Sequence, residues 1–235
     1  MMPLRKLGAG SIRCVYIIID LSGDSAGGNL AAGISLKLRD DKFKPMPKVQ
    51  VLIYPLLQLL TVNTPSWQYN EHALVLSKAA ALKFLCNYLF GDWTHFDVVY
   101  ANNHTSADVK KRLIEHLPLD ALPYDALRLD YKPQSIQEGD SVFWNKHRHF
   151  FIDSYLNPLM ADSLRGLPPA VISSCQYDVL RDDSYFYAYR LRDAKVLVEH
   201  VALNACYHGW IASHRQIKQF DKYMDSLIQS IDKYI

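Results

Sequence analysis

The sequence predicts an α/β protein with a mostly parallel sheet flanked by helices, and three observations support this. Apolar runs typical of buried strands lie near residues 14–20, 49–54, 168–175 and 196–201. A segment with helical character lies between each strand and the next, which implies right-handed crossovers and parallel neighbours. The length of 235 residues fits one large α/β domain or two small ones.

The composition argues against several classes of function. The net charge is only +2 and Lys and Arg do not cluster, so we expect no nucleic-acid partner. The four cysteines show no Cys-x-x-Cys spacing, and we expect no metal and no cofactor. No apolar run approaches the roughly 20 residues of a membrane-spanning helix. The chain as written is therefore expected to be soluble.

The first strand leads into a glycine-rich turn, and the motif Gly23-x-Ser25-x-Gly27 has the form of a nucleophile elbow. In such an elbow a strained serine lies at the tip, and side chains at the two glycines would collide with the adjoining strand and helix. The helix N-terminus behind Ser25 would direct amide groups and a positive dipole end at an anion. The alternative is a glycine-rich turn without catalysis.

The first helix is predicted at about residues 25–38, with Leu30, Ile34 and Leu38 repeating on one face. Residues 1–13, which precede the first strand, form a short, polar segment that contains glycine, and we expect them to be poorly ordered.

The pattern loosens between the second and third strands. Residues 77–90 read as a helix capped by Ser77, and a weaker helix is predicted over 106–116. A long insertion in an α/β domain is usually a lid or a substrate-binding cap. We therefore expect a cap insertion at about 60–160, with an aromatic-rich lid around Tyr124–Phe151.

Two further residues complete a catalytic pattern. A serine hydroxyl becomes a nucleophile when a histidine takes its proton and a carboxylate orients that histidine. On folds with this elbow the order is serine, acid, histidine, each beyond the carboxyl end of a strand. Asp178 follows the strand 168–175, and His208 follows the strand 196–201 and a predicted loop, 202–207. Both are expected at the sheet edge where the elbow lies.

Each of these candidates has alternatives. Asp178 would also suit an N-cap of the following helix, and Asp182 or Asp183 could replace it as the acid. We favour Asp178 because the other two fall in the first helical turn, where acidic residues commonly complement the dipole. His208 is preferred because it follows the last strand and precedes a glycine. The other histidines are expected on the surface, in the core or in a final helix at about 212–232: His72, His95, His104, His116, His147, His149, His200 and His214.

Five motifs of the chain occur together: Gly23–Ala31, Leu52–Leu56, Leu164–Pro168, Gln176–Asp183 and His208–Gly209. From about residue 15 to the C-terminus, the chain resembles the arylacetamide deacetylase-like branch of the hormone-sensitive-lipase family. The resemblance implies an α/β-hydrolase fold with a helical cap, acting on carboxylic esters or aryl amides of lipid-like or xenobiotic type. It also implies Ser25 as nucleophile, His208 as general base and acid, Asp178 as orienting carboxylate and the Ala26 amide in the oxyanion hole.

The chain departs from the family before the elbow and before the histidine. Only 24 residues precede Ser25, and no His-Gly-Gly-Gly motif is present, so we expect missing N-terminal strands and an incomplete oxyanion hole. The sequence Asn204-Ala-Cys-Tyr-His-Gly209 stands where the family resembles Glu-Asp-Gly-Phe-His-Gly. Cys175 resembles a family cysteine whose partner lies in the missing segment, which implies an unpaired thiol here.

These features lead to competing hypotheses. The first is a single α/β-hydrolase domain over 1–235, truncated at its N-terminus, that hydrolyses small-molecule esters or amides. The alternative is a catalytically impaired remnant that binds apolar ligands or partners without turnover. A third is a peptidase or thioesterase with the same triad. The resemblance implies a location at the lumenal side of the endoplasmic reticulum membrane and a role in lipid metabolism, through an anchor that this sequence lacks.

Overall fold

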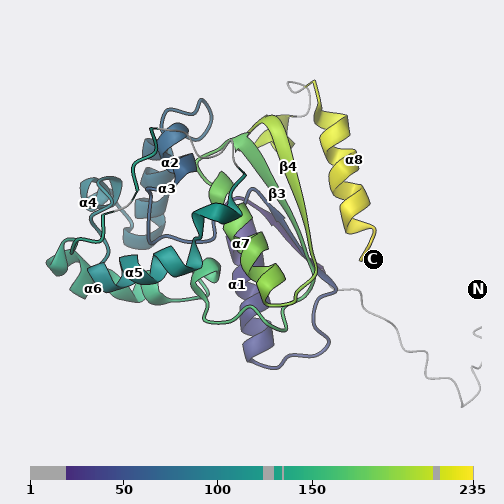
Figure 1. The fold of residues 1–235 in the computed structure, drawn as a ribbon, viewed down its shortest axis with the longest axis horizontal. Coiled ribbons are helices and arrows are strands. Elements are labelled where there is room, and N and C mark those ends of the chain that lie inside the picture. The colour runs from purple at the N-terminus through teal and green to yellow at the C-terminus, as the bar shows by residue number, and fades with distance from the viewer. Residues whose placement is uncertain (1–19, 124–129, 134, 214–217, 235) are drawn as a thin grey trace, which may run out of the picture.

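The computed structural model describes residues 20–123, 130–133, 135–213 and 218–234. Within these ranges four strands form one sheet in the order β1-β2-β3-β4 (Figure 1). Every neighbouring pair is parallel, so the predicted parallel sheet is confirmed. The strands are β1 (Asp20–Asp24), β2 (Val49–Ile53), β3 (Ala170–Tyr177) and β4 (Val198–Tyr207).

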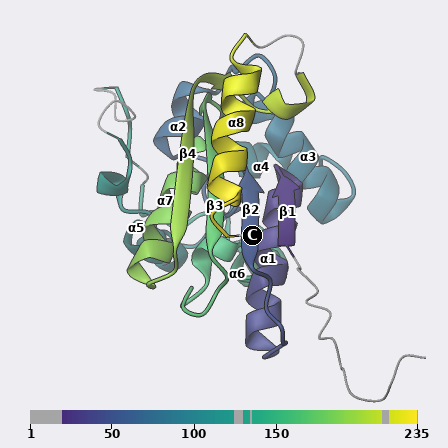
Figure 2. The same ribbon diagram turned by 90° about the vertical axis from the view of Figure 1, so that its right-hand side faces the viewer.

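Helices cover both faces of this sheet (Figures 1 and 2). On one face lie α1 (Ala26–Asp40) and α7 (Arg181–Asp193), and on the other lies α8 (Phe220–Ile231). Consecutive residues of a strand point to opposite faces, and each of the two faces contributes to a hydrophobic core. Leu52 and Ile172 belong to the core with α1 and α7, whereas Val51 and Val171 belong to the core with α8.

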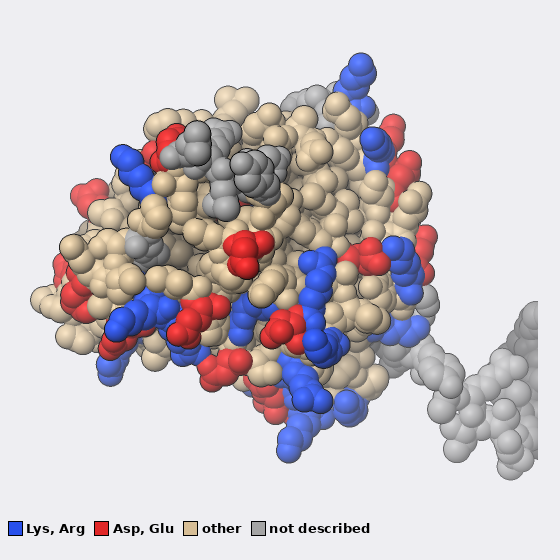
Figure 3. Space-filling view, in the orientation of Figure 1, with Lys and Arg blue, Asp and Glu red and all other residues tan. Residues whose placement is uncertain are grey.

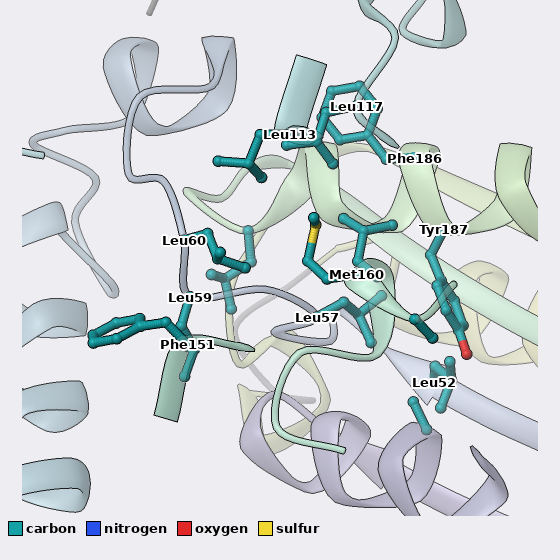
Figure 4. Close-up of a cluster of buried hydrophobic side chains, with 14 of the residues drawn as sticks. Leu52, Leu57, Leu59, Leu60, Leu113, Leu117, Phe151, Met160, Phe186 and Tyr187 are labelled. Atoms are coloured by element: carbon teal, nitrogen blue, oxygen red, sulfur yellow. The ribbon is translucent and has the colours of Figure 1, made fainter. Parts of the chain in front are cut away.

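Residues 54–169, which we call the helical segment, connect β2 to β3 and lie to one side of the sheet (Figure 1). Its side chains join the core on the α7 face of the sheet. Leu57, Leu113 and Phe151 from this segment lie in one buried cluster with Phe186 of α7 (Figure 4). The segment contains α2 (Pro65–Tyr69), α3 (Lys78–Phe90), α4 (Phe96–Tyr100), α5 (Ala107–His116), η1 (Leu119–Ala121), α6 (Ser141–Ile152) and η3 (Pro158–Met160).

The helical segment has more regular structure than the sequence pattern predicted. The two predicted helices are confirmed as α3 and α5, and the Oγ atom of Ser77 accepts a hydrogen bond from the Ala80 amide at 3.2 Å. Sequence reasoning missed α2, α4 and α6. Two of these have five residues each, which is too short for helical periodicity to be visible. The third begins at Ser141 after the N-cap Asp140, whose side chain accepts hydrogen bonds from two amides of the first turn.

Two details of the sheet layer differ from prediction. The first helix does not bury the face that carries Leu30 and Ile34, which are 55% and 45% exposed. It buries Leu36 together with small residues, and a Cβ atom at Gly33 would lie 2.3 Å from the carbonyl oxygen of Tyr155. The predicted loop 202–207 is also wrong, because β4 continues through it to Tyr207.

Several predictions fall partly or wholly outside the described residues, and the predicted final helix differs from the structure. Of the first predicted strand, 14–20, only its last residue is described, and β1 continues from there to Asp24. Residues 1–13 lie outside the described residues, as do His214 and part of the predicted lid. The predicted final helix is two elements, η4 (Trp210–Ser213) and α8.

The described residues contain no helix that is both long and apolar enough to span a bilayer. On the face in Figure 3, basic and acidic side chains lie beside one another along the lower part of the molecule, and neither sign forms a large continuous area there.

Candidate active site

Ser25 is the single residue between the end of β1 and the start of α1. Its backbone has φ 55° and ψ −120°, a conformation that costs a non-glycine residue roughly 1–3 kcal/mol. The surrounding backbone holds it in place. Its amide donates to the carbonyl of Ile53 at 2.9 Å, and its own carbonyl accepts from the amides of Asn29 at 3.2 Å and Leu56 at 3.3 Å. The strained serine is therefore fixed by α1 and by the end of β2.

The glycines of the elbow do not all serve the predicted purpose. A Cβ atom at Gly23 would lie 2.2 Å from the carbonyl oxygen of Gly27, so a side chain is excluded there. At Gly27 the nearest atom would be 4.0 Å away, and the predicted collision is wrong for this residue. The second crowded position is Gly28, where a Cβ atom would lie 2.8 Å from the Cβ atom of Pro55.

The structure brings the three predicted residues into one hydrogen-bonded chain. The Nε2 atom of His208 lies 2.9 Å from the Oγ atom of Ser25, and its Nδ1 atom lies 2.8 Å from Oδ2 of Asp178. The side chain of Asp178 is fully buried and that of His208 is 10% exposed, whereas Ser25 is half-buried. Residues that lie 183 and 30 positions apart in the sequence thus meet at the carboxyl ends of the strands.

Asp178 contacts His208 but is not the N-cap of α7, which is Leu180. Its Oδ2 atom accepts from His208, while its Oδ1 atom accepts from the amide of Leu180 at 2.9 Å, just ahead of α7. Its backbone carbonyl also accepts from the side-chain amide of Asn70 at 3.0 Å. The Leu180 amide therefore orients the carboxylate, while Asn70 of the helical segment holds the backbone of the same residue.

The two alternative acids have hydrogen-bond partners other than His208. Oδ2 of Asp182 accepts from the amide of Ser66 at 2.6 Å. Oδ2 of Asp183 accepts from the amide of Leu57 at 2.9 Å, and its Oδ1 from the side chain of Gln58 at 3.2 Å. Burial raises the pKa of the Asp183 carboxyl to about 7. Both carboxylates join α7 to the helical segment, a role that sequence reasoning missed.

Tyr54 is a further site residue that sequence reasoning missed. Its ring lies against the imidazole of His208, with ring centroids 4.7 Å apart. Its hydroxyl donates to Oδ2 of Asp24 at 3.2 Å, and burial followed by the charge of Asp24 raises the pKa of the tyrosine. The residue has φ 37° directly after β2. The signal was its place in the motif Leu52–Leu56, between a strand and a proline.

An apolar cavity of about 390 Å³ adjoins Ser25 and Ala26. Ala26 is the first residue of α1, and amides in the first turn of a helix have no acceptor within that helix. The amide and the positive end of the helix dipole are thus available beside the serine. The walls of the cavity come from α1, from α3 and from the chain after β2, and include Leu30, Val62, Trp67, Leu82, Phe84 and Leu85.

Comparison with known proteins gives consistent results. A family model described as "alpha/beta hydrolase fold" matches residues 17–153 and 130–212. Neutral cholesterol ester hydrolase 1 of Bos taurus is 37% identical over 196 residues, which cover 81% of this chain and 48% of that protein. Arylacetamide deacetylase of Bos taurus is 36% identical over 197 residues, 83% of this chain and 49% of that protein. The chain spans about half the length of these curated relatives.

Solved structures agree on the fold. The carboxylesterase EstE1 is 25% identical with a TM-score of 0.58, over 89% of this chain and 52% of that one. A fungal esterase from Rhizomucor miehei is 22% identical with a TM-score of 0.60, over 91% and 50%. The chain belongs to the α/β-hydrolase family, in the branch that contains arylacetamide deacetylase and neutral cholesterol ester hydrolase.

Proposed function

We propose that the chain carries a serine-hydrolase site for carboxylic esters, or aryl amides, of apolar substrates. The observation that supports this most strongly is the hydrogen-bonded chain from Asp178 through His208 to a strained Ser25. Nucleophilic serines on strand-to-helix elbows have this arrangement.

In this proposal the Oγ atom of Ser25 attacks the carbonyl carbon while its proton moves to Nε2 of His208, which lies 2.9 Å away. The imidazolium then gives that proton to the leaving alcohol or amine, and an acyl-serine remains. A water molecule then attacks the acyl carbon while its proton moves to His208. The return of that proton to the Oγ atom of Ser25 releases the carboxylic acid. The carboxylate of Asp178 accepts a hydrogen bond from Nδ1–H of His208 and stays ionised, which fixes the tautomer and stabilises the positive charge that forms on the ring.

The oxyanion of the tetrahedral intermediate would face the start of α1. We assign the Ala26 amide as one donor, since it follows the serine and lies in the first turn of the helix. A donor of this kind contributes about 10²–10³ in kcat. The dipole of α1 adds to the same stabilisation.

The cavity supports an apolar substrate. Its walls are mostly aliphatic and aromatic, and it opens directly beside Ser25, so an acyl or aryl group held there would place its carbonyl near the Oγ atom. The relatives are named for a cholesterol ester and for an arylacetamide. We therefore propose lipid-like or aromatic esters, and aryl amides, as the substrate class.

Labelling with a fluorophosphonate probe tests the proposal, because such probes modify serines only where a base activates them. We expect one adduct, mapped by mass spectrometry to the peptide that contains Ser25 and absent from Ser25→Ala. The exposed neighbour Ser22 provides the matched control, and Ser22→Ala should label as the wild type does. Folded wild-type protein without label would favour a binding protein without turnover. An adduct on another serine would mean that the nucleophile was wrongly assigned.

A further inference from the structure

Two buried cysteines lie in contact beneath the catalytic edge of the sheet. The Sγ atoms of Cys175 and Cys206 are 3.4 Å apart, and both residues are fully buried. Cys175 lies on β3 three residues before Asp178, and Cys206 lies on β4 two residues before His208. The resemblance implied an unpaired Cys175, whereas the structure places a second thiol directly beside it.

A local irregularity of the sheet creates this contact. Cys175 is paired in register with Leu203, but the next pair is Tyr177 with Tyr207, so β4 contains two extra residues between the two pairs. Ala205 lies within this stretch and has φ 54°, an unfavourable conformation for alanine. Its amide donates to Oε1 of Gln176 at 2.8 Å. The extra residues form a bulge that carries the thiol of Cys206 to Cys175.

We propose that Cys175 and Cys206 form a disulfide bond that joins the two strands leading to Asp178 and His208. Bonded sulfur atoms lie about 2.0 Å apart, so the two thiols have only to close a short gap. The reaction is exchange with a small-molecule disulfide. The two thiols lose two protons and two electrons as the new S–S bond forms, and the small disulfide is reduced to two thiols.

The surroundings determine when this exchange occurs. Burial raises the pKa of the Cys175 thiol, and the reactive form in exchange is the thiolate. Attack in the folded protein therefore requires the end of β4 to open, or the bond forms before folding is complete. Among the described residues β4 is an edge strand, which makes local opening there easier than in the centre of the sheet.

Peptide mapping without reduction tests the proposal. The protein is incubated with oxidised and reduced glutathione at pH 8, either folded or during refolding from urea, and remaining thiols are alkylated before digestion. We expect a peptide that links Cys175 to Cys206, about 2 Da lighter than the two reduced peptides together. We also expect Tm to rise by roughly 5 °C or more over the reduced protein.

The buried Cys86 on α3 provides a matched control. Cys86→Ala should still form the link, whereas Cys206→Ala and Cys175→Ala should lose both the linked peptide and the rise in Tm. Because mapping of the wild type alone identifies the link, a variant that fails to fold does not decide the result. The proposal is overturned if Cys175 and Cys206 are both recovered as alkylated thiols from the folded sample and from the refolded sample. A link to Cys14 or Cys86, or a stable glutathione adduct, would overturn it equally.

Discussion

The sheet edge and the helical segment contribute to the site in different ways. At the sheet edge Ser25, Asp178 and His208 are held by backbone hydrogen bonds, by strand ends and by one another. The helical segment contributes most of the apolar cavity wall, and on α3 Phe84 and Tyr88 are 72% and 68% exposed. On the proposed function, the sheet edge would carry out the reaction, and the helical segment would select the substrates that reach it.

The strongest test of this contrast compares Asp178, which contacts His208, with Asp183, which contacts the helical segment. Asp178→Asn should lower kcat for a p-nitrophenyl ester by about 10⁴, because an amide no longer fixes the tautomer of His208. Asp183→Asn should keep most of the activity, since its carboxylate binds Leu57 and Gln58 instead. Circular dichroism and thermal unfolding establish that both variants fold. Equal losses would contradict the assignment of Asp178 as the orienting acid.

The contact between the two regions should also give stability a pH dependence. The pKa of Asp183 is about 7 in the folded protein, against an ordinary value of 3.8. Between these values the unfolded state has lost a proton that the folded state retains. The carboxyl therefore lowers the free energy of unfolding by about 1.4 kcal/mol for each unit of rising pH, and the effect levels off above pH 7.

Urea unfolding between pH 4 and pH 7 measures this contribution as the difference between wild type and Asp183→Asn. The variant should show a flatter profile across that window, because its amide does not titrate. Parallel profiles for the two proteins would mean that this carboxyl is not held protonated by burial.

Two glycines of the elbow, Gly23 and Gly27, look equivalent in the sequence but have different surroundings in the structure. Gly23→Ala should lower the free energy of unfolding by about 1–3 kcal/mol, because its Cβ atom would collide with the carbonyl of Gly27. Gly27→Ala should raise it by up to about 1 kcal/mol, since this residue lies in α1 with open space beside it. Chemical denaturation measures both. The reverse order would contradict the geometry of the turn.

The smallest effect is expected at the mouth of the cavity. Phe84→Ala should raise KM for a long-chain p-nitrophenyl ester about three- to tenfold, which corresponds to roughly 1 kcal/mol of apolar contact. Its kcat, and both constants for the acetyl ester, should stay near wild type. The control is Phe43→Ala, a half-exposed phenylalanine outside the cavity wall. A fall in kcat alone would contradict a role in substrate selection.

Sequence reasoning identified the residues at the sheet edge because local chemistry constrains them strongly. Gly23 leaves room for the tight strand-to-helix turn at Ser25. The order of the strands places Asp178 and His208 at the same edge of the sheet. The apolar repeat of the first helix did not identify its buried face, because α1 buries small residues and Leu36 and leaves Leu30 outside the core. Sequence reasoning also missed Tyr54, whose contact with His208 depends on the positive φ angle that follows β2.

Features that depend on distant contacts were not predictable from local pattern. The carboxylate of Asp183 has the sequence position of a helix-dipole residue, and only the folded chain brings Leu57 to it. The extension of β4 depends on a bulge with φ 54° at Ala205, for which an alanine gives no signal. The five-residue helices of the helical segment likewise depend on tertiary packing rather than on periodicity.

The central claim is that Ser25, His208 and Asp178 act together as a hydrolytic triad. The most direct test is the rate of p-nitrophenyl acetate hydrolysis by folded wild-type protein and by Ser25→Ala, with the two proteins matched in thermal stability. We predict turnover by the wild type and a fall to the background rate in the variant, a loss of at least about 10⁴-fold. Equal rates in the two proteins, or a folded wild type no faster than buffer, would contradict the account.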